Sequence, residues 1–581
     1  MGPAGTCAWP ARSGKRRRKR GCGIEETAAA LCHDSIVNKL SLAVAAFVAV
    51  VACNNTAQSQ MADVSGERIR AHVKFLASDL LEGRAPGSRG GDLATEYVAT
   101  QFALAGAKPA GDNGTYFQNF KLVGVAPQPD SQLTAIPLSG TPTNFKWLDD
   151  FVGVTQRQIP DAQFEAQAVF VGHGIVAPEY KWDDYNGVDV TGKVVVFFTG
   201  EPPSEDPAFF TGKALTYYGR WTYKFEEAAR HGAAAALIIH TEPTASYGWE
   251  VVRSSWGNEE QQVALAAGEK ALVFAGWMTK AMGERVGATI SMSTDEMLAA
   301  ANKPGFRART MPLRFRGRAP AKIRTVETRN VVARIDGSDA QAKDEAVVFS
   351  AHWDHLGVGE AVNGDKIYNG AADNATGTAM LLEMAHAWAA LPQKPRRSAI
   401  FVAAAAEEQG LRGSFYFGQH PVIPAGKIAA ALNFDMFLPY GRAKDVNVNG
   451  ADRTTIYPIV QQAAQRMSLT ISPDARPEAG LYYRSDHFSF ARVGIPAFSV
   501  DGGDDLVGKP AGEGAKLFKE FNDKRYHQPS DEYKDDWDFA GMEQFSQFGL
   551  LIGIDVANQP AMPTWKAGDE FLPARQASGV K

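Results

Sequence analysis

The stretch AVVFSAHWDH at residues 346–355 decides the fold of the larger part of this chain. An apolar run precedes His352, which is typical of a buried strand, and metal-binding side chains follow as the run ends. Two later apolar runs end in the same way: 398–406 (SAIFVAAAA) before Glu407 and Glu408, and 428–434 (IAAALNF) before Asp435. Because reactive groups collect at the carboxyl ends of parallel strands, we expect these side chains to meet at one edge of a sheet.

The surrounding pattern favours an α/β fold. Downstream of Val326 strands, loops and helices alternate, which is typical of a largely parallel sheet. The loop GAADNATG at 370–377 places Asp373 just before a helix that we expect over 378–391. We therefore predict a mixed, mostly parallel central sheet with helices on both faces, together with an inserted β-rich α/β module.

The cysteines exclude a thiolate metal site in the folded body. All four lie within the first 53 residues: Cys7, Cys22, Cys32 and Cys53. A metal would have to be held by imidazole and carboxylate groups, which suit Zn²⁺ or a similar divalent ion. Several such groups at one sheet edge match the needs of a two-metal hydrolytic centre, in which one group bridges the ions and a carboxylate serves as the base.

The length and the net charge of the chain reduce the number of candidate functions. The chain has 581 residues, 45% of them apolar, which is enough for several domains with a large core. The first 52 residues hold eight Lys and Arg against three acidic residues, so the rest has 52 basic and 62 acidic residues, a net charge of about −10. This acidic balance excludes nucleic-acid binding as the expected function of the folded body.

The N-terminal segment predicts export. The apolar run at 40–52 has the length of a signal-peptide apolar region and is too short to span a bilayer. It ends at Val-Val-Ala-Cys53, which resembles a bacterial lipobox, so Cys53 is a candidate lipid anchor; the alternative is a chance cysteine beside an ordinary cleavage site. Three interpretations of the residues before this run remain open: translation that starts at Val37, an authentic basic extension, or a twin-arginine export signal.

Other segments are interpreted as structural. Periodic apolar residues predict two amphipathic helices between 66 and 105, separated by a Gly-rich loop at 82–91 that lacks phosphate-loop spacing. Short strands and a helix–strand pair then follow as far as Phe315. In that region His173 and His240 lack a matched carboxylate cluster, so we expect them to be structural.

Six ordered motifs, taken together, resemble the M28 family of metallopeptidases, bacterial aminopeptidases with a zinc pair. The motifs are AHWD at 351–354, GAADNATG at 370–377, AEE at 406–408, NFDM at 433–436, SDH at 485–487 and YHQPSD at 526–531. The resemblance runs from about Arg68 to Gly553 and is interrupted by a module similar in shape to a protease-associated domain. One departure is Ala372, where the family commonly has an acidic residue.

The resemblance implies a domain layout and a set of roles. The layout is an extension, signal peptide, lipobox and linker over 1–61, peptidase segments over 62–134 and 316–560, the insert over 135–315 and a tail over 561–581. The implied roles are Asp373 as the bridging ligand of two Zn²⁺, Glu408 and His527 as ligands of one ion, His352 and Asp435 as ligands of the other, and Glu407 as general base. Other divalent ions could take the place of zinc.

Three supporting roles follow from position. Asp354 is expected to orient the His352 imidazole, with His355 as the rival partner. Tyr482, where the family carries a substrate-side tyrosine, could donate to the oxyanion; the adjacent Tyr483 is the alternative. Alternatively, one residue of the same segment could bind a substrate carboxylate, which would favour a carboxypeptidase: Arg484 or His487.

The expected function is that of an exported zinc exopeptidase, above all an aminopeptidase acting on peptides. Carboxypeptidase, dipeptidase and glutaminyl cyclase activities are alternatives on the same scaffold, and a non-catalytic binding protein is a third class. The expected location is the periplasm, or the outer membrane of a bacterium through a lipid anchor. The sequence leaves the oligomeric state open.

Overall fold

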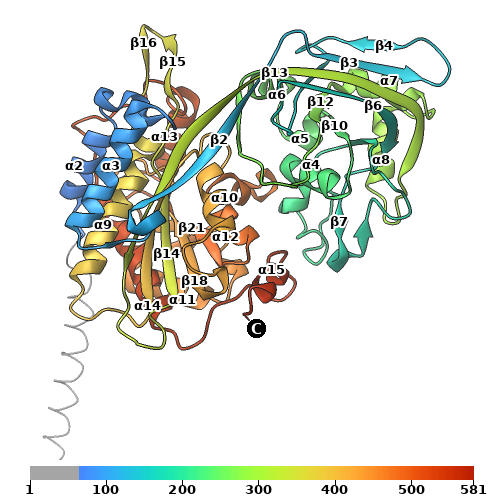
Figure 1. Ribbon diagram of the computed structural model, residues 1–581. Coiled ribbons are helices and arrows are strands. Elements are labelled where there is room, and N and C mark those ends of the chain that lie inside the picture. Colours follow the sequence, from blue (N-terminus) through green and yellow to red (C-terminus); the bar gives the residue numbers. More distant parts are fainter. Residues whose placement is uncertain (1–63, 581) are drawn as a thin grey trace, which may run out of the picture. The chain divides into compact units, whose positions relative to one another are not determined.

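The computed structural model describes residues 64–580, and Asp63–Lys581 forms one compact unit (Figure 1). The predicted signal segment and Cys53 lie outside the described residues. Within the part that is described, no helix has the length and apolar character needed to cross a bilayer.

Parallel strands form the centre of the first sheet. Their order is β21 (Ala497–Ser499), β18 (Ile428–Asn433), β14 (Ala346–His352) and β17 (Ser398–Ala404). Every residue of β14, β17 and β18 is buried, so these strands read as continuous apolar runs instead of alternating ones. The three strands predicted from the apolar runs are confirmed.

Helices cover both faces of these strands, as predicted. One group is α2 (Gly66–Leu76), α3 (Arg89–Leu104), α9 (Thr376–Ala390) and α14 (Ala540–Asn558), and the other is α10 (Arg412–Gln419) and α12 (His487–Arg492). The groups lie on opposite sides of β14 in Figure 1. The side chains of Ser65 and Ser88 cap α2 and α3 by accepting backbone N–H bonds. The two helices expected between 66 and 105 are therefore present.

One long strand, β13 (Arg309–Ile335), joins two sheets. Its end pairs antiparallel with β17, its middle with β2 (Phe117–Pro127), and its beginning with β3 (Gln132–Pro137) and β6 (Asp161–Phe170). The boundaries predicted after residues 134 and 315 fall inside β3 and β13. Backbone pairing runs through both positions, so the insert and the central sheet share a continuous strand.

The insert has a parallel sheet and a core of its own. Strands β6, β9 (Val194–Phe197), β10 (Ala235–Ile239) and β12 (Phe274–Met278) are parallel, and β5 (Phe151–Val154) closes the edge antiparallel to β12. Helix α4 (Trp221–Arg230) precedes β10, as the helix–strand pattern predicts. Further elements of the insert are β4 (Thr143–Phe145), α6 (Trp249–Trp256), β11 (Glu260–Val263), α7 (Lys280–Ala288) and α8 (Thr294–Ala301).

Elements after the insert include β15 (Gly357–Val362), β16 (Asp365–Tyr368), α11 (Tyr457–Arg466), α13 (Glu513–Lys524) and α15 (Leu572–Ala577).

Candidate metal centre

The carboxyl ends of the parallel strands bring the predicted side chains together. Strand β14 ends at His352, while Glu408 and Asp435 lie in the loops that follow β17 and β18. Asp373 enters from the segment before α9, and His527 follows α13. Because the three strands are parallel neighbours, residues more than eighty positions apart in the chain share one edge.

Asp373 lies between two histidines. Its Oδ1 is 3.3 Å from His352 Nε2, and its Oδ2 is 3.3 Å from His527 Nε2. His352 Nε2 is also 3.1 Å from Asp435 Oδ1, and His527 Nε2 is 3.0 Å from Glu408 Oε2. One carboxylate thus contacts two imidazoles, and each imidazole has a second carboxylate of its own.

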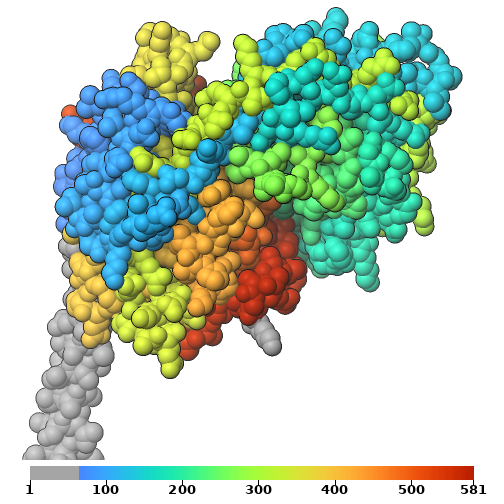
Figure 2. Space-filling model, viewed as in Figure 1, coloured from blue at the N-terminus to red at the C-terminus, as the bar shows by residue number. Residues whose placement is uncertain are grey.

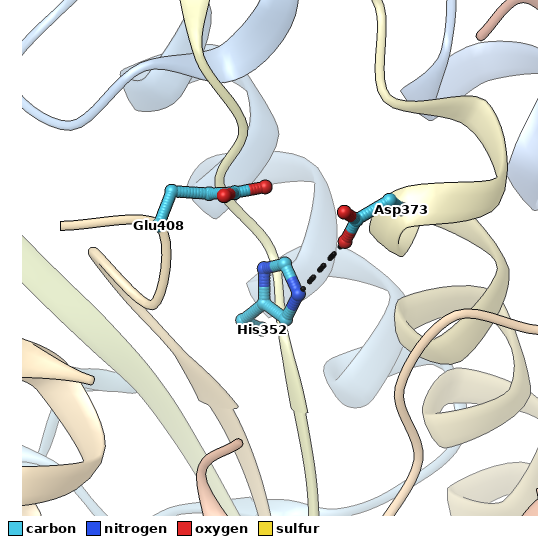
Figure 3. Close-up of side chains that lie close together, drawn as sticks. All are labelled: His352, Asp373 and Glu408. Carbon is cyan, nitrogen blue, oxygen red and sulfur yellow. Dashed lines mark ion pairs between the residues drawn. The ribbon is translucent and has the colours of Figure 1, made fainter. Parts of the chain in front are cut away.

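Three of these residues offer ligand atoms within 4.8 Å of one another: His352, Asp373 and Glu408. Figure 3 shows that they converge from a strand end, a helix start and a loop. One donor atom nearby, His355 Nε2, is buried without any partner among residues 64–580, and the short contacts of Glu408 Oε1 and His527 Nε2 lack hydrogen-bond geometry. Buried polar atoms seldom stay unsatisfied, and oxygen and nitrogen donors without sulfur suit Zn²⁺. The residues present therefore fit a divalent metal.

The electrostatics of the cluster favour charged ligands. Burial opposes ionisation of Asp373, but its contacts with His352 and His527 outweigh burial and hold its pKa well below the usual value. Burial likewise opposes ionisation of Glu408, yet its histidine neighbours lower its pKa to about 2. Both carboxylates are ready to bind a cation at neutral pH.

A backbone cradle fixes Asp373. Asp531 accepts hydrogen bonds from the Ala372 and Asp373 amides, at 3.0 Å and 3.1 Å respectively. The side-chain amide of Asn374 donates through Nδ2 to the backbone carbonyl of Phe434, the residue before Asp435. The peptide bond between Asp373 and Asn374 is cis. The alanine at position 372 leaves this cradle intact, because only its backbone takes part.

Glu407 and Glu408 have different surroundings. Ala406 has a φ of 55°, so the chain leaves the strand direction just before the pair. Glu408 Oε1 lies 2.6 Å from His355 Nδ1, whereas the Glu407 carboxylate has no hydrogen bond or ion pair among residues 64–580. Burial raises the Glu407 pKa well above its usual range, and nearby carboxylates add to the effect. A carboxylate with a raised pKa is suited to accept a proton.

The orienting role expected of the Asp354 carboxylate stays a prediction, because the carboxylate and the His352 imidazole form an ion pair without a hydrogen bond. Its Oδ1 is 3.8 Å from His352 Nδ1, beyond hydrogen-bond distance, and accepts instead from the Glu407 amide at 3.1 Å. The Asp354 backbone carbonyl is the nearer partner, 3.2 Å from His352 Nδ1. His355, the rival partner for His352, lies against Glu408.

The hydroxyl of Tyr482, the predicted oxyanion donor, has a backbone partner in this structure. Its hydroxyl donates to the Ala497 carbonyl at 2.9 Å inside the core, and the Tyr483 hydroxyl donates to Glu570 at 2.6 Å. The phenol near the cluster is that of Tyr526, whose ring stacks on His527 with centroids 3.9 Å apart. Burial and several carboxylates of the cluster raise the Tyr526 pKa. The position of Tyr526 directly before a predicted ligand was the signal that could have found it.

The Gly-rich loop contributes an arginine to the centre. Arg84 is only 1% exposed and donates to the carbonyls of Leu76, Trp353, Asn369 and Gly370 at 2.5–3.0 Å. Trp353 follows His352, and Gly370 precedes Asp373 by three residues. The loop is structural, as predicted, and it also borders the site. In the insert, His173 contacts Asn302 and His240 contacts the Tyr247 carbonyl, which agrees with structural roles.

Comparison with known proteins identifies the segment that contains the candidate metal centre. Residues 330–547 match the sequence profile "Peptidase family M28". This segment belongs to peptidase family M28. The M28 segment contains every predicted ligand and the Glu407–Glu408 pair, whereas the insert precedes it.

Curated relatives are similar over a limited stretch. A "Probable zinc metalloprotease" of Pyricularia oryzae is 32% identical over 152 residues, which is 26% of this chain and 29% of that protein. A protein of the same description from Pyrenophora teres f. teres is 34% identical over 107 residues, 18% of this chain and 21% of the relative. The matches therefore span less than a third of each relative.

Solved structures with similar architecture include two bacterial aminopeptidases. An aminopeptidase from Aneurinibacillus sp. strain AM-1 aligns over 88% of this chain and 98% of its own, with a TM-score of 0.47 and 20% identity. A zinc aminopeptidase from Bacillus subtilis aligns over 88% and 97%, with a TM-score of 0.40 and 16% identity.

Proposed function

We propose that this protein is an exported zinc-dependent exopeptidase, and specifically an aminopeptidase that removes N-terminal residues from peptides. One observation carries the proposal: Asp373 has one oxygen near His352 and the other near His527, and each histidine has a second carboxylate beside it. A bridging carboxylate with terminal ligands on both sides is what a two-metal hydrolytic centre requires. The M28 match and the zinc metalloprotease relatives support the same chemistry.

In this proposal the chain binds two zinc ions. Asp373 would be shared by both ions; His352 and Asp435 would hold one of them, and Glu408 and His527 the other. Zinc bound there would lower the pKa of a water molecule and polarise the scissile carbonyl. Asp531 and Arg84 keep the ligand-bearing loops in place through the backbone contacts described above.

Glu407 is the proposed general base. It takes a proton from the attacking water and later donates that proton to the leaving amine. Its raised pKa favours the second transfer, and the lack of a side-chain partner leaves the carboxylate free for the first. Tyr526, beside His527, is the proposed donor to the oxyanion, because the Tyr482 hydroxyl is occupied in the core.

The proposed setting is outside the cytoplasm, in the periplasm or on a lipid anchor at Cys53. This part rests on the apolar run at 40–52 and its terminal cysteine. The proposed partners are peptides. Nucleic acid is not among them, because the chain beyond residue 52 is acidic.

Zinc content and end-blocked dipeptides test the function together. We expect about two zinc ions per chain, and cleavage of a dipeptide blocked at its C-terminus but not of one blocked at its N-terminus. A chelator should abolish cleavage, and added zinc should restore it. Cleavage that requires a free carboxylate would replace the aminopeptidase proposal with a carboxypeptidase, and a metal-free, inactive protein would refute both.

A further inference from the structure

The insert contacts the M28 segment beside the candidate centre. The Leu215 amide donates to the Pro477 carbonyl at 3.1 Å. Glu570 accepts from the Tyr217 amide at 3.1 Å and from the Tyr483 hydroxyl at 2.6 Å, so one carboxylate ties the two segments together. Figure 2 shows the teal and green insert against the orange and red C-terminal residues. The insert loop before α4 is thereby fixed on the short helix η9 (Leu481–Arg484).

This junction leads directly to the predicted ligands. Ser485, the residue after η9, donates its hydroxyl to Asp435 Oδ2 at 2.5 Å and accepts a hydrogen bond from Asn433 at 2.8 Å. Asp435 in turn contacts His352. The end of η9 is therefore one residue from a side chain that contacts the cluster.

Two guanidinium groups at this junction lack partners. Arg220 ends the insert loop and Arg484 ends η9. Within residues 64–580 neither forms an ion pair or donates a side-chain hydrogen bond, and Arg220 Nε is buried without any acceptor. The nearby arginines differ: Arg453 pairs with Asp569 and Glu570 and Arg492 pairs with Glu226, all at 2.8–2.9 Å. Arg220 and Arg484 thus differ from Arg453 and Arg492, which are both paired with carboxylates.

The elements that carry the two arginines lie against each other, with the Tyr217 and Tyr483 ring centroids 6.1 Å apart. Burial, and then the charge of Arg484, lower the pKa of Arg220 to about 10, so Arg220 remains charged at neutral pH. The other groups that act on Arg220 are phenols: Tyr247, Tyr217 and Tyr483. Two unpaired arginines with phenols around them would be stabilised by an anion, and the planar guanidinium fork matches a carboxylate best.

We propose that Arg220 of the insert and Arg484 of the M28 segment together bind a carboxylate of the peptide substrate. The insert then takes part in substrate selection, although the predicted catalytic groups all belong to the M28 segment. This inference rests on the proposed function and names its substrate class. The carboxylate has two sources, the C-terminus of a short peptide or an acidic side chain near the scissile bond.

Two matched peptide pairs separate these sources. The first is Leu-Ala-Ala and its C-terminal amide, and the second is Leu-Glu-Ala-amide and Leu-Gln-Ala-amide. Because a charge-assisted hydrogen bond contributes about 1.5–3 kcal/mol, kcat/KM should favour the charged member of one pair by about 10- to 100-fold. The pair that shows the preference identifies the source.

Variants test the arginines. Arg220→Gln and Arg484→Gln should each lower kcat/KM about 10- to 100-fold for the charged peptide and less than about threefold for its neutral partner. Turnover of the neutral peptide reports that the variant is folded. Arg285→Gln, which changes an exposed arginine of α7, is the matched control and should alter neither value. Equal treatment of both peptides by the wild type, or equal loss on both in the arginine variants, overturns the inference.

Binding separates this inference from the proposed function. Calorimetric titration of the zinc-loaded Glu407→Gln variant with the same peptides needs no turnover. If the wild type cleaves none of the four peptides but the charged one binds in an Arg484-dependent manner, the function fails and the carboxylate site stands. If charged and neutral peptides bind alike, the site is refuted whatever the activity.

Discussion

Replacing Arg84 with methionine should weaken metal binding without touching a metal ligand. The guanidinium donates to four backbone carbonyls: those of Leu76, Trp353, Asn369 and Gly370. Trp353 adjoins His352, and Gly370 is three residues before Asp373. One side chain therefore holds the two loops that carry a terminal ligand and the proposed bridging ligand.

The size of the expected loss in Arg84→Met follows from the burial of the guanidinium. Hydrogen bonds to a charged donor contribute about 1.5–3 kcal/mol each, but burying the guanidinium costs several kcal/mol. The net stabilisation by Arg84 is therefore smaller than the sum over its four hydrogen bonds. Removing the donor leaves buried carbonyls unpaired, and each unpaired carbonyl should destabilise the fold by about 1–3 kcal/mol. Groups that orient ligands typically change metal affinity by 10- to 100-fold, which is about 1.4–2.8 kcal/mol. We expect zinc affinity to fall within this range in Arg84→Met.

Competition with a chromophoric zinc chelator measures the effect. Arg84→Lys keeps the charge with fewer donors and should lie between the wild type and Arg84→Met. Arg89→Met, which changes the exposed first residue of α3 just after this loop, is the control and should bind zinc like the wild type. A folded Arg84→Met protein with wild-type zinc affinity would refute the reasoning.

Four further predictions concern other parts of the chain. Glu407→Gln should retain zinc and lower kcat by about 10²- to 10⁴-fold, and near-normal turnover would remove Glu407 from the base role. Asp373→Ala should lose zinc as well as activity by elemental analysis; a fully metallated variant would contradict the bridge. Burial lowers the His72 pKa from 6.5 to about 4. The uncharged imidazole therefore contributes to the stability of the fold fully above pH 6.5, and this contribution is lost as the pH falls through 4. Between pH 6.5 and 4 the free energy of unfolding, measured with denaturant, should fall by about 3 kcal/mol less in His72→Asn than in the wild type. Parallel plots of the free energy of unfolding against pH for the two proteins would argue against this role. Cys53→Ser should release the protein from the membrane fraction, whereas unchanged retention would count against lipidation.

The strands and their polar ends were predictable because each is a local pattern. A buried parallel strand is apolar on both faces, and its reactive residue follows the last apolar one, as at His352 and Asp435. The insert boundary at residue 315 was not predictable in this way. Strand β13 continues through that position because it pairs with partners on both sides, and pairing partners are distant in sequence.

Supporting roles depended on side-chain direction, which a single sequence does not encode. Tyr482 and Tyr526 are both tyrosines near predicted ligands, yet the Tyr482 hydroxyl is held by Ala497 and the Tyr526 ring lies on His527. Arg84 is an ordinary loop arginine in the sequence. It contacts both ligand loops because α2 and α3 pack on α9, which follows Asp373 directly.

The sequence by itself determined the kind of chemistry, since no cysteine follows residue 53 and the histidines and carboxylates stand where apolar strands end. Only the tertiary structure decided which of those groups meet. Contacts such as His527 with Asp373 and Tyr217 with Glu570 join residues more than 150 positions apart. Their distance in space is set by the packing of strands and helices, because local sequence specifies an element and its ends but not the element that lies beside it.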